Sequence, residues 1–162
     1  MSELGQQFDF TNKPFAYQQL AASLRGLLAG ERDLVANAAN TVALIFHSVP
    51  SLNWVGFYFL KAGELVVGPF QGKPACVRIA VGRGVCGAAA ARRQTLRVED
   101  VHHFPDHIAC DSASNSELVV PLLRGASLLG VLDLDSPVVA RFDAEDQRGI
   151  EQLVEVFVSS SD

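Results

Sequence analysis

The sequence predicts an α+β fold in which a central antiparallel sheet is covered by helices from the N- and C-terminal parts of the chain. Apolar residues recur with helical spacing near both ends, whereas the middle consists of short runs typical of strands. Most of these runs are separated by short turns, which join antiparallel neighbours. The length of 162 residues is usual for one domain, so we expect a single domain over residues 1–162.

Two helices are expected before the sheet. The first runs from about Pro14 to Leu28, with Thr11 or Asn12 as its N-cap. The second runs from about Asp33 to Ser48 and carries one apolar stripe. The stripe consists of Leu34, Ala38, Val42, Ile45 and Val49.

The middle of the chain predicts the sheet. Strands are expected over NWVGFYFL, ELVVGPF, VRIAV, TLRVED, ELVVPLL and SLLGVLDLD, with a short helix over GVCGAAAARRQ. The stretch from Val101 to Asn115 is long, polar and irregular, and loops of that length are usually functional or mobile. Asp143 is a good N-cap for a final helix. Its apolar face consists of Ile150, Leu153, Val154, Phe157 and Val158.

Composition excludes several classes of protein. Apolar residues make up 49% and charged residues 19% of the chain, which is a globular composition. The net charge of −5 argues against nucleic acid and anionic membrane as partners, because both require a basic face. We find neither a membrane-spanning stretch nor a secretory signal. Three widely spaced cysteines are unlike a secreted disulfide framework, so we expect a cytoplasmic protein in which any disulfide is transient and catalytic.

The cysteines are the first candidates for chemistry. Cys110 lies in the polar loop segment HIACDSASNSE, where a thiol can be either reactive or inert. Cys76 opens a predicted strand and on local sequence reads as a buried strand residue. Cys86 stands between glycines in GRGVCG. Their spacing matches neither a thioredoxin-like CxxC site nor a zinc ribbon, and spacing alone does not show which of them meet.

Acidic residues form a second candidate group. Asp133 and Asp135 point to one face of a strand, opposite Leu132 and Leu134, and Glu117 opens the preceding strand. The pair can simply be a solvated strand end. If it instead faces a cleft, carboxylates roughly 7 Å apart repel by about 2 kcal/mol at an effective dielectric of 20. Such a group requires a shared proton or a cation, either an amino acid's ammonium or a metal ion.

Histidines and aromatic residues leave further alternatives. His102, His103 and His107 precede Cys110 and could form a zinc site with it, but solvated loop histidines are the favoured interpretation. Trp54 and Tyr58 share one face of a strand, opposite Val55, Phe57 and Phe59. They either pack in the core or enclose a small pocket for a thioether or methyl group.

Several of these segments occur together in a recognisable order. NWVGFYF, GPFQGKPACVRI, GRGVCG, HIACDSASNSELVVP and GVLDLDS closely resemble the free methionine-(R)-sulfoxide reductase family, which is built on a GAF domain. The resemblance extends from about Phe15 to Phe157. It implies a GAF-like fold and a thiol-dependent reductase of free methionine-(R)-sulfoxide. The preference for the (R) epimer rests wholly on the resemblance.

The resemblance also implies roles for individual residues. Cys110 would attack the sulfoxide sulfur and remain as a sulfenic acid, Cys76 would condense with it to a disulfide, and Cys86 would be an auxiliary thiol or alternative resolving thiol. The substrate would be bound by Glu117, Asp133, Asp135, Trp54 and Tyr58. Thioredoxin would be the external reductant, and no bound cofactor or metal is expected. A homodimer is one option, and the alternative function is a non-catalytic GAF-type module that binds a small molecule or senses redox state.

Overall fold

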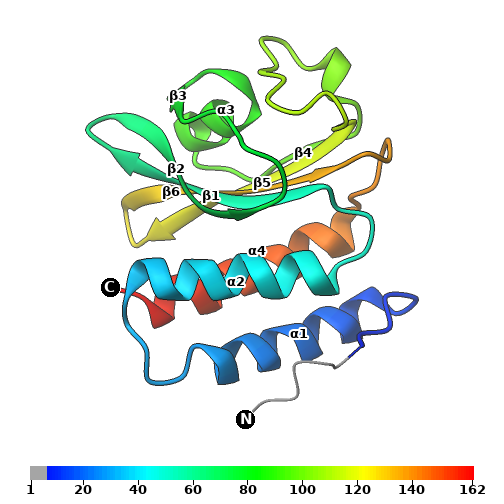
Figure 1. The fold of residues 1–162 in the computed structure, drawn as a ribbon, viewed down its shortest axis with the longest axis vertical. Coiled ribbons are helices and arrows are strands. Elements are labelled where there is room, and N and C mark those ends of the chain that lie inside the picture. The colour runs from blue at the N-terminus through cyan, green and yellow to red at the C-terminus, as the bar shows by residue number, and fades with distance from the viewer. Residues whose placement is uncertain (1–6) are drawn as a thin grey trace.

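The computed structural model describes residues 7–162 and contains a six-stranded antiparallel sheet with helices on both sides (Figure 1). The elements in chain order are α1 (Lys13–Leu27), α2 (Leu34–Ser48), β1 (Trp54–Lys61), β2 (Glu64–Gln71), β3 (Arg78–Ala80), α3 (Gly84–Arg92), β4 (Leu96–Val98), η1 (Val101–His103), β5 (Ser116–Arg124), β6 (Ser127–Ser136) and α4 (Ala144–Ser160). The strand order is β3-β2-β1-β6-β5-β4. This architecture confirms the predicted α+β class. The predicted domain also includes residues 1–6, which lie outside the described residues.

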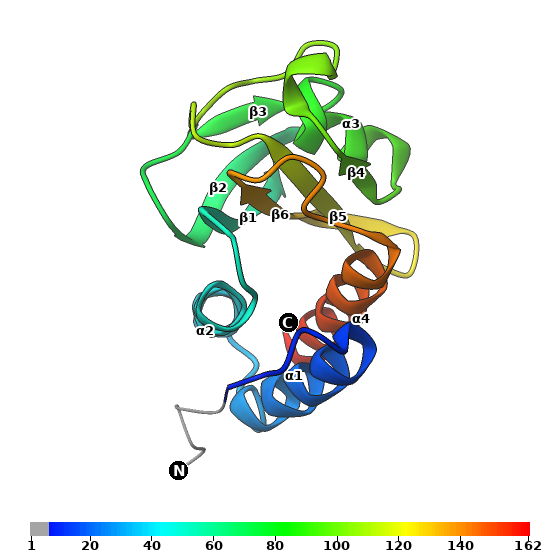
Figure 2. The ribbon, with the colours of Figure 1, turned by 90° about the vertical axis from the view of Figure 1, so that its right-hand side faces the viewer.

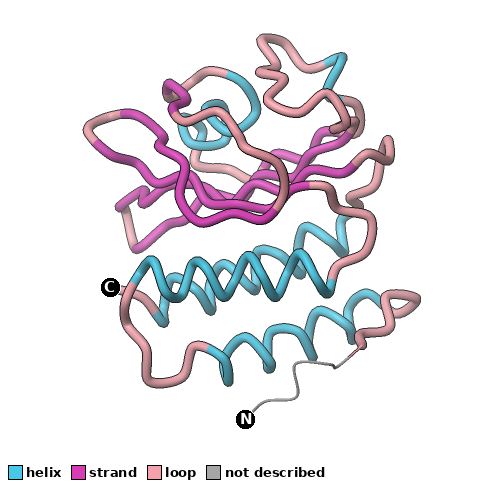
Figure 3. The backbone as a smooth tube through the Cα atoms, in the orientation of Figure 1, coloured by secondary structure: helices cyan, strands magenta, loops and turns pink. Residues whose placement is uncertain are grey.

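The two faces of the sheet have different coverings. The helices α2 and α4 lie against one face and α1 packs beneath them against α4, whereas α3 and the loop segments lie over the other face (Figures 1 and 2). The tube in Figure 3 shows that the irregular segments after β2 and β4 gather on this second face. The sheet therefore separates a structural side, covered by helices, from a loop-covered side.

Side-chain alternation along β1 and β6 produces the two faces. Val55, Phe57 and Leu132 enter the large core shared with the helices. Trp54 and Tyr58 belong to a smaller apolar cluster on the other face. Because successive residues of a strand point to opposite faces, this arrangement follows from the sequence pattern and confirms the predicted division.

Polar caps fix the ends of the predicted helices. The side chain of Asn12 accepts a hydrogen bond from the Phe15 amide at 3.3 Å, so Asn12, not Thr11, caps α1. Asp33 caps α2 by accepting from the Ala36 amide at 2.8 Å. Asp143 caps α4 within a reciprocal capping box. The helix boundaries therefore lie within about one residue of those expected.

The edge strands are shorter than the sequence pattern predicts. The run VRIAV contributes only β3, Arg78–Ala80, and TLRVED contributes only β4, Leu96–Val98. Each of these strands has a neighbour on one side only, so fewer ladder hydrogen bonds hold it. Cys76 consequently lies just before β3 and not at its first residue.

A buried ionic network joins α1 to α4. Asp146 is fully buried, and its Oδ2 accepts from the Lys13 ammonium at 2.7 Å and from the Arg141 guanidinium at 3.1 Å. Its Oδ1 accepts from the Tyr17 hydroxyl at 2.8 Å. These partners satisfy a carboxylate that would otherwise be costly to bury. The same contact places the Tyr17 ring directly against Gly149 of α4.

The close approach of α1 and α4 predicts the effect of Gly149→Ala. A Cβ at this position would overlap the buried ring of Tyr17, so we expect a loss of about 1–3 kcal/mol from overpacking despite the better helix propensity of alanine. Gly26→Ala is the matched control, because no atom lies within 4 Å of its Cβ position and its φ is negative. Urea denaturation measures both variants. Equal stabilities would contradict this account of the helix packing.

Candidate active site

The predicted functional residues converge on the loop-covered face of the sheet. They line one pocket together with residues of α3 and of the loop after β4. The sheet register explains much of this convergence, because Trp54 pairs with Asp135 and Glu117 pairs with Asp135 on its other side. Three adjacent strands, β1, β6 and β5, thus form the floor of the pocket. The predicted site residues that line it are Cys86, Cys110, Glu117, Asp133, Asp135, Trp54 and Tyr58.

A disulfide joins the two cysteines that flank the pocket. Cys76 and Cys110 are bonded across 34 positions of sequence, with Cα atoms 5.7 Å apart. Cys110 is exposed in its loop, whereas Cys76 is half-buried beside β3. The two sulfurs are therefore on the same side of the sheet and within bonding reach.

Carboxylates are buried in the floor of the pocket. Glu117 and Asp133 each retain only 6% of their exposure. Burial raises the pKa of Asp133 to about 6. Burial first, and then repulsion by Asp133, raises the pKa of both Glu117 and Asp135 well above the usual range. These groups therefore share protons near neutral pH unless a cation enters the pocket.

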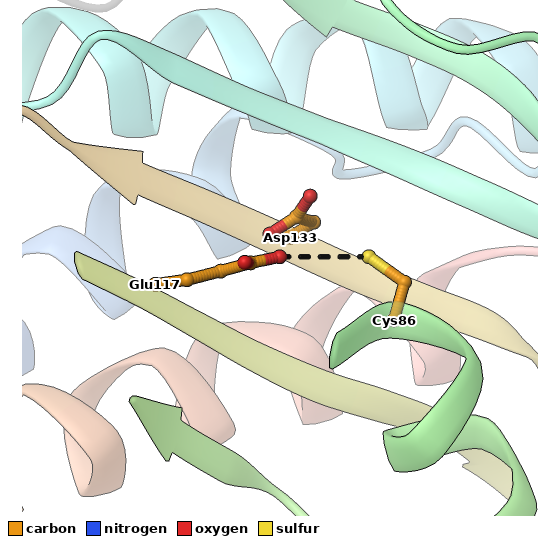
Figure 4. A group of neighbouring side chains, drawn as sticks. All are labelled: Cys86, Glu117 and Asp133. Atoms are coloured by element: carbon orange, nitrogen blue, oxygen red, sulfur yellow. Dashed lines mark hydrogen bonds between the residues drawn. The ribbon is translucent and has the colours of Figure 1, made fainter. Parts of the chain in front are cut away.

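The free thiol of Cys86 lies beside these acids. Its Sγ donates a hydrogen bond to Oε1 of Glu117 at 3.8 Å, and Asp133 lies next to both (Figure 4). Burial, followed by the charges of Asp133 and Glu117, raises the pKa of the Cys86 thiol well above its usual value. A protonated, buried thiol is a poor nucleophile, so this geometry separates Cys86 from the exposed Cys110.

An aromatic wall closes one side of the pocket. Trp54 stacks on Phe70 with ring centroids 5.4 Å apart, and its Nε1 donates to the Lys73 carbonyl at 3.1 Å. The Tyr58 hydroxyl donates to the Cys76 carbonyl at 2.9 Å. Trp54 and Tyr58 therefore line the pocket and also hold the segment that carries Cys76 through these hydrogen bonds.

Glycine makes room for this wall. A side chain at Gly56 would collide with the Trp54 ring, and Gly72 has a φ of +126° with Trp54 and the Asn53 carbonyl close to its Cβ position. The sequence pattern did not identify Phe70 or Gly72 as part of this wall. The sequence feature that marks them is the segment GPFQG, in which Phe70 stands between two glycines and pairs with Gly56 of β1.

The histidines do not assemble around Cys110. His102 and His103 are exposed and face Asp100, with 2.8 Å between His102 Nδ1 and Oδ1 of Asp100. His107 instead lines the pocket, with Nε2 3.7 Å from Oε2 of Glu117. The proposed histidine–cysteine zinc site is therefore wrong, because the loop turns these side chains in different directions. The sequence could not show that His107 would meet an acid ten positions away.

Asn53 is a further site residue that sequence reasoning missed. Its Nδ2 donates to Oδ2 of Asp111 at 3.2 Å and to Oγ of Ser114 at 3.1 Å. These hydrogen bonds connect the loop that carries Cys110 to the start of β1. Its only sequence signal is its place before the strand in NWVGFYF.

The chain is similar to known proteins over most of its length. The family model of the GAF domain matches residues 16–159. The free methionine-R-sulfoxide reductase of Escherichia coli is 54% identical over 143 residues, covering 88% of this chain and 87% of that protein. The Saccharomyces cerevisiae protein of the same name is 42% identical, covering 92% and 87%.

A solved structure extends the match to three dimensions. The free methionine-R-sulfoxide reductase of Neisseria meningitidis in complex with its substrate is 42% identical, with a TM-score of 0.91 over 96% of this chain and 94% of that chain. The fold is that of a GAF domain. The chain belongs to the free methionine-R-sulfoxide reductase family of GAF domains, which confirms the resemblance inferred from its motifs. Among residues 7–162, no helix is both long and apolar enough to cross a membrane.

The buried acids predict a link between pH and stability. Because folding raises the pKa of Asp133 from 3.8 to about 6, its stabilising contribution is present below about pH 4 and is lost as the pH rises through 6. We expect Asp133→Asn to be more stable than the parent at pH 8, by about 3 kcal/mol, with a smaller difference at pH 5. Thermal denaturation at the two pH values measures it. The exposed control Asp106→Asn should leave the profile unchanged, and a pH-independent effect of Asp133→Asn would refute the explanation.

Proposed function

We propose that this protein is an enzyme that reduces free methionine-(R)-sulfoxide to methionine with its own thiols. The observation that carries the proposal is the Cys76–Cys110 disulfide, which lies against the same pocket as Glu117, Asp133 and Asp135. A redox-active pair beside buried acids fits a substrate that has a positive ammonium and a reducible sulfur. The relatives bearing the name of this activity, in Escherichia coli and yeast, support it.

The first chemical step takes place at Cys110. Its thiolate attacks the sulfoxide sulfur, and the oxygen then passes to Sγ of Cys110 as the bonds from the methionine sulfur to oxygen and to Cys110 break. Cys110 remains as a sulfenic acid and methionine leaves. A protonated carboxyl among Glu117, Asp133 and Asp135 donates to the departing oxygen, and their raised pKa values support this role. Exposure favours Cys110 as nucleophile over the buried Cys86.

The second and third steps regenerate the enzyme. The Cys76 thiol attacks the sulfenic sulfur, which forms the disulfide and releases water. Thioredoxin then reduces the disulfide by thiol exchange and is itself oxidised. Since the sulfur must be reached from solvent, we assign the attack of this reductant to the exposed Cys110, with Cys76 as the leaving thiolate. Cys86 stays an auxiliary thiol.

Substrate recognition follows from the chemistry of the pocket. The ammonium group pairs with the carboxylates, and Trp54 and Tyr58 enclose the methyl group of the sulfoxide side chain. A peptide-bound residue has no ammonium and would leave these acids unpaired in a dry site. The choice of the (R) epimer is supported by the names of the relatives.

We also propose a cellular compartment and an oligomeric state for this enzyme. A reducing cytoplasm suits a disulfide that is opened in each cycle. A homodimer is the predicted assembly, and Phe15 on α1 and Val35 on α2 are exposed apolar side chains on the helical side. Light scattering of the purified protein measures the oligomeric state.

Serine variants of the cysteines test the chemical cycle. We expect Cys110→Ser to release no methionine, because it lacks the nucleophile. We expect Cys76→Ser to release one equivalent and then stop, since its sulfenic acid has no partner. Rapid-quench measurement of methionine, without and with thioredoxin recycling, distinguishes the two. Turnover by Cys110→Ser would remove the basis of the mechanism.

A blocked substrate tests recognition of the ammonium group. N-acetyl-methionine sulfoxide should be reduced at least about 10³-fold less efficiently than the free amino acid, measured as kcat/KM, because the acetyl group removes the positive charge. The methyl ester of methionine sulfoxide keeps that charge and is the matched control. Similar efficiency for the acetylated and free forms would mean that the acids do not bind the ammonium.

A further inference from the structure

The floor of the pocket has the ligand set of a metal site. The side-chain ligand atoms of Cys86, Glu117 and Asp133 lie within 4.8 Å of one another, and all three residues are buried (Figure 4). They come from α3, β5 and β6, so the fold itself brings them together. Among residues 7–162, this is the group whose geometry suits an ion, whereas the histidines of the loop do not form one.

A second observation points to a ligand at the same place. Oδ1 of Asp133 is buried and has no hydrogen-bond partner among the described residues. A buried carboxylate oxygen without a partner is costly, and such groups normally have a proton donor, a water or a cation beside them. This oxygen belongs to one of the three candidate ligands. The unsatisfied group and the ligand cluster therefore coincide.

The donor atoms select a borderline-soft metal. One sulfur and two carboxylates suit Zn²⁺ better than Mg²⁺ or Ca²⁺, which prefer oxygen ligands alone. With zinc bonds of about 2.3 Å to sulfur and 2.0 Å to oxygen, a tetrahedral site needs about 3.5 Å between these ligand atoms. The distance from Cys86 Sγ to Oε1 of Glu117 is 3.8 Å. The adjoining cavity of about 40 Å³ has room for a water as fourth ligand.

We propose that Cys86, Glu117 and Asp133 bind Zn²⁺ reversibly, and that this ion and the ammonium of methionine sulfoxide exclude each other. On binding, the Cys86 thiol loses its proton to solvent and its sulfur becomes a ligand, with no change of oxidation state. The exclusion rests on the proposed function, because it requires the substrate to use the same acids. Zinc would thus inhibit the proposed reduction.

The oxidised protein allows the metal site to be tested through a single thiol. With Cys76 and Cys110 bonded, Cys86 is the free thiol, so any thiolate–metal absorption must come from it. We expect Co²⁺ titration of the oxidised protein to produce a saturable near-ultraviolet thiolate-to-cobalt band with one ion per chain. Added Zn²⁺ should remove this band. Absence of the band, or a band that zinc leaves unchanged, would overturn the proposal.

Variants locate the ion. Cys86→Ala and Cys86→Ser should lose the band, and Asp133→Asn should weaken cobalt binding at least tenfold. Asp100→Asn, an acid beside the exposed His102 and His103, is the matched control and should titrate as the parent does. Circular dichroism verifies folding, and two substitutions at Cys86 keep the test valid if one fails to fold. Loss of binding only in Asp100→Asn would place the metal at the histidines and refute the proposed site.

Competition separates this inference from the proposed function. The double variant Cys76→Ser with Cys110→Ser retains Cys86 but cannot turn over. Free methionine sulfoxide should displace Co²⁺ from it, and N-acetyl-methionine sulfoxide should not. A cobalt band that the free sulfoxide fails to displace would refute the exclusion and question the assigned substrate site. No band in a parent enzyme that still turns over would refute the metal site alone.

Discussion

Burial of neighbouring carboxylates is the constraint around which the loop-covered half of the molecule is arranged. Glu117 and Asp133 cannot both be ionised at low cost where they are buried, since repulsion between like charges grows as the local dielectric falls. The protein has no lysine or arginine ion-paired to either acid within residues 7–162. The negative charge of these acids is therefore neutralised by a proton, a ligand or a cation. Affinity for a positive group is thereby obtained at the expense of the stability of the empty protein.

The antiparallel sheet is well suited to holding such a group. Neighbouring strands place Trp54, Asp135 and Glu117 side by side in register, so the floor of the pocket has little freedom to relax. The opposite face is fixed by apolar packing against α2 and α4 and by the ionic network around Asp146. Rigid support on one side permits a strained electrostatic arrangement on the other.

Much of the fold followed from local patterns in the sequence. Alternation along β1 and β6 predicted which side chains share a face, and Asp143 marked the start of the last helix through its capping chemistry. The cap of the first helix was narrowed only to Thr11 or Asn12, and the structure shows Asn12. Shortening of the edge strands was not predictable, because it depends on which strands have two neighbours. The cysteines and acids could be named as candidates. Their meeting could not be derived from spacing, since Cys76 and Cys110 approach only through the packing of two loops, and the contacts of His107 and Cys86 with Glu117 are likewise tertiary.

The two halves of the disulfide are anchored unequally. The carbonyl groups of Lys73 and Cys76 are held by Trp54 and Tyr58, both embedded in β1. The segment of Cys110 is connected to β1 through side-chain contacts of Asn53 and is otherwise largely exposed. If the bond opens in the proposed cycle, the thiol of Cys76 therefore stays on a segment fixed to β1, whereas the thiol of Cys110 lies on the less firmly held loop.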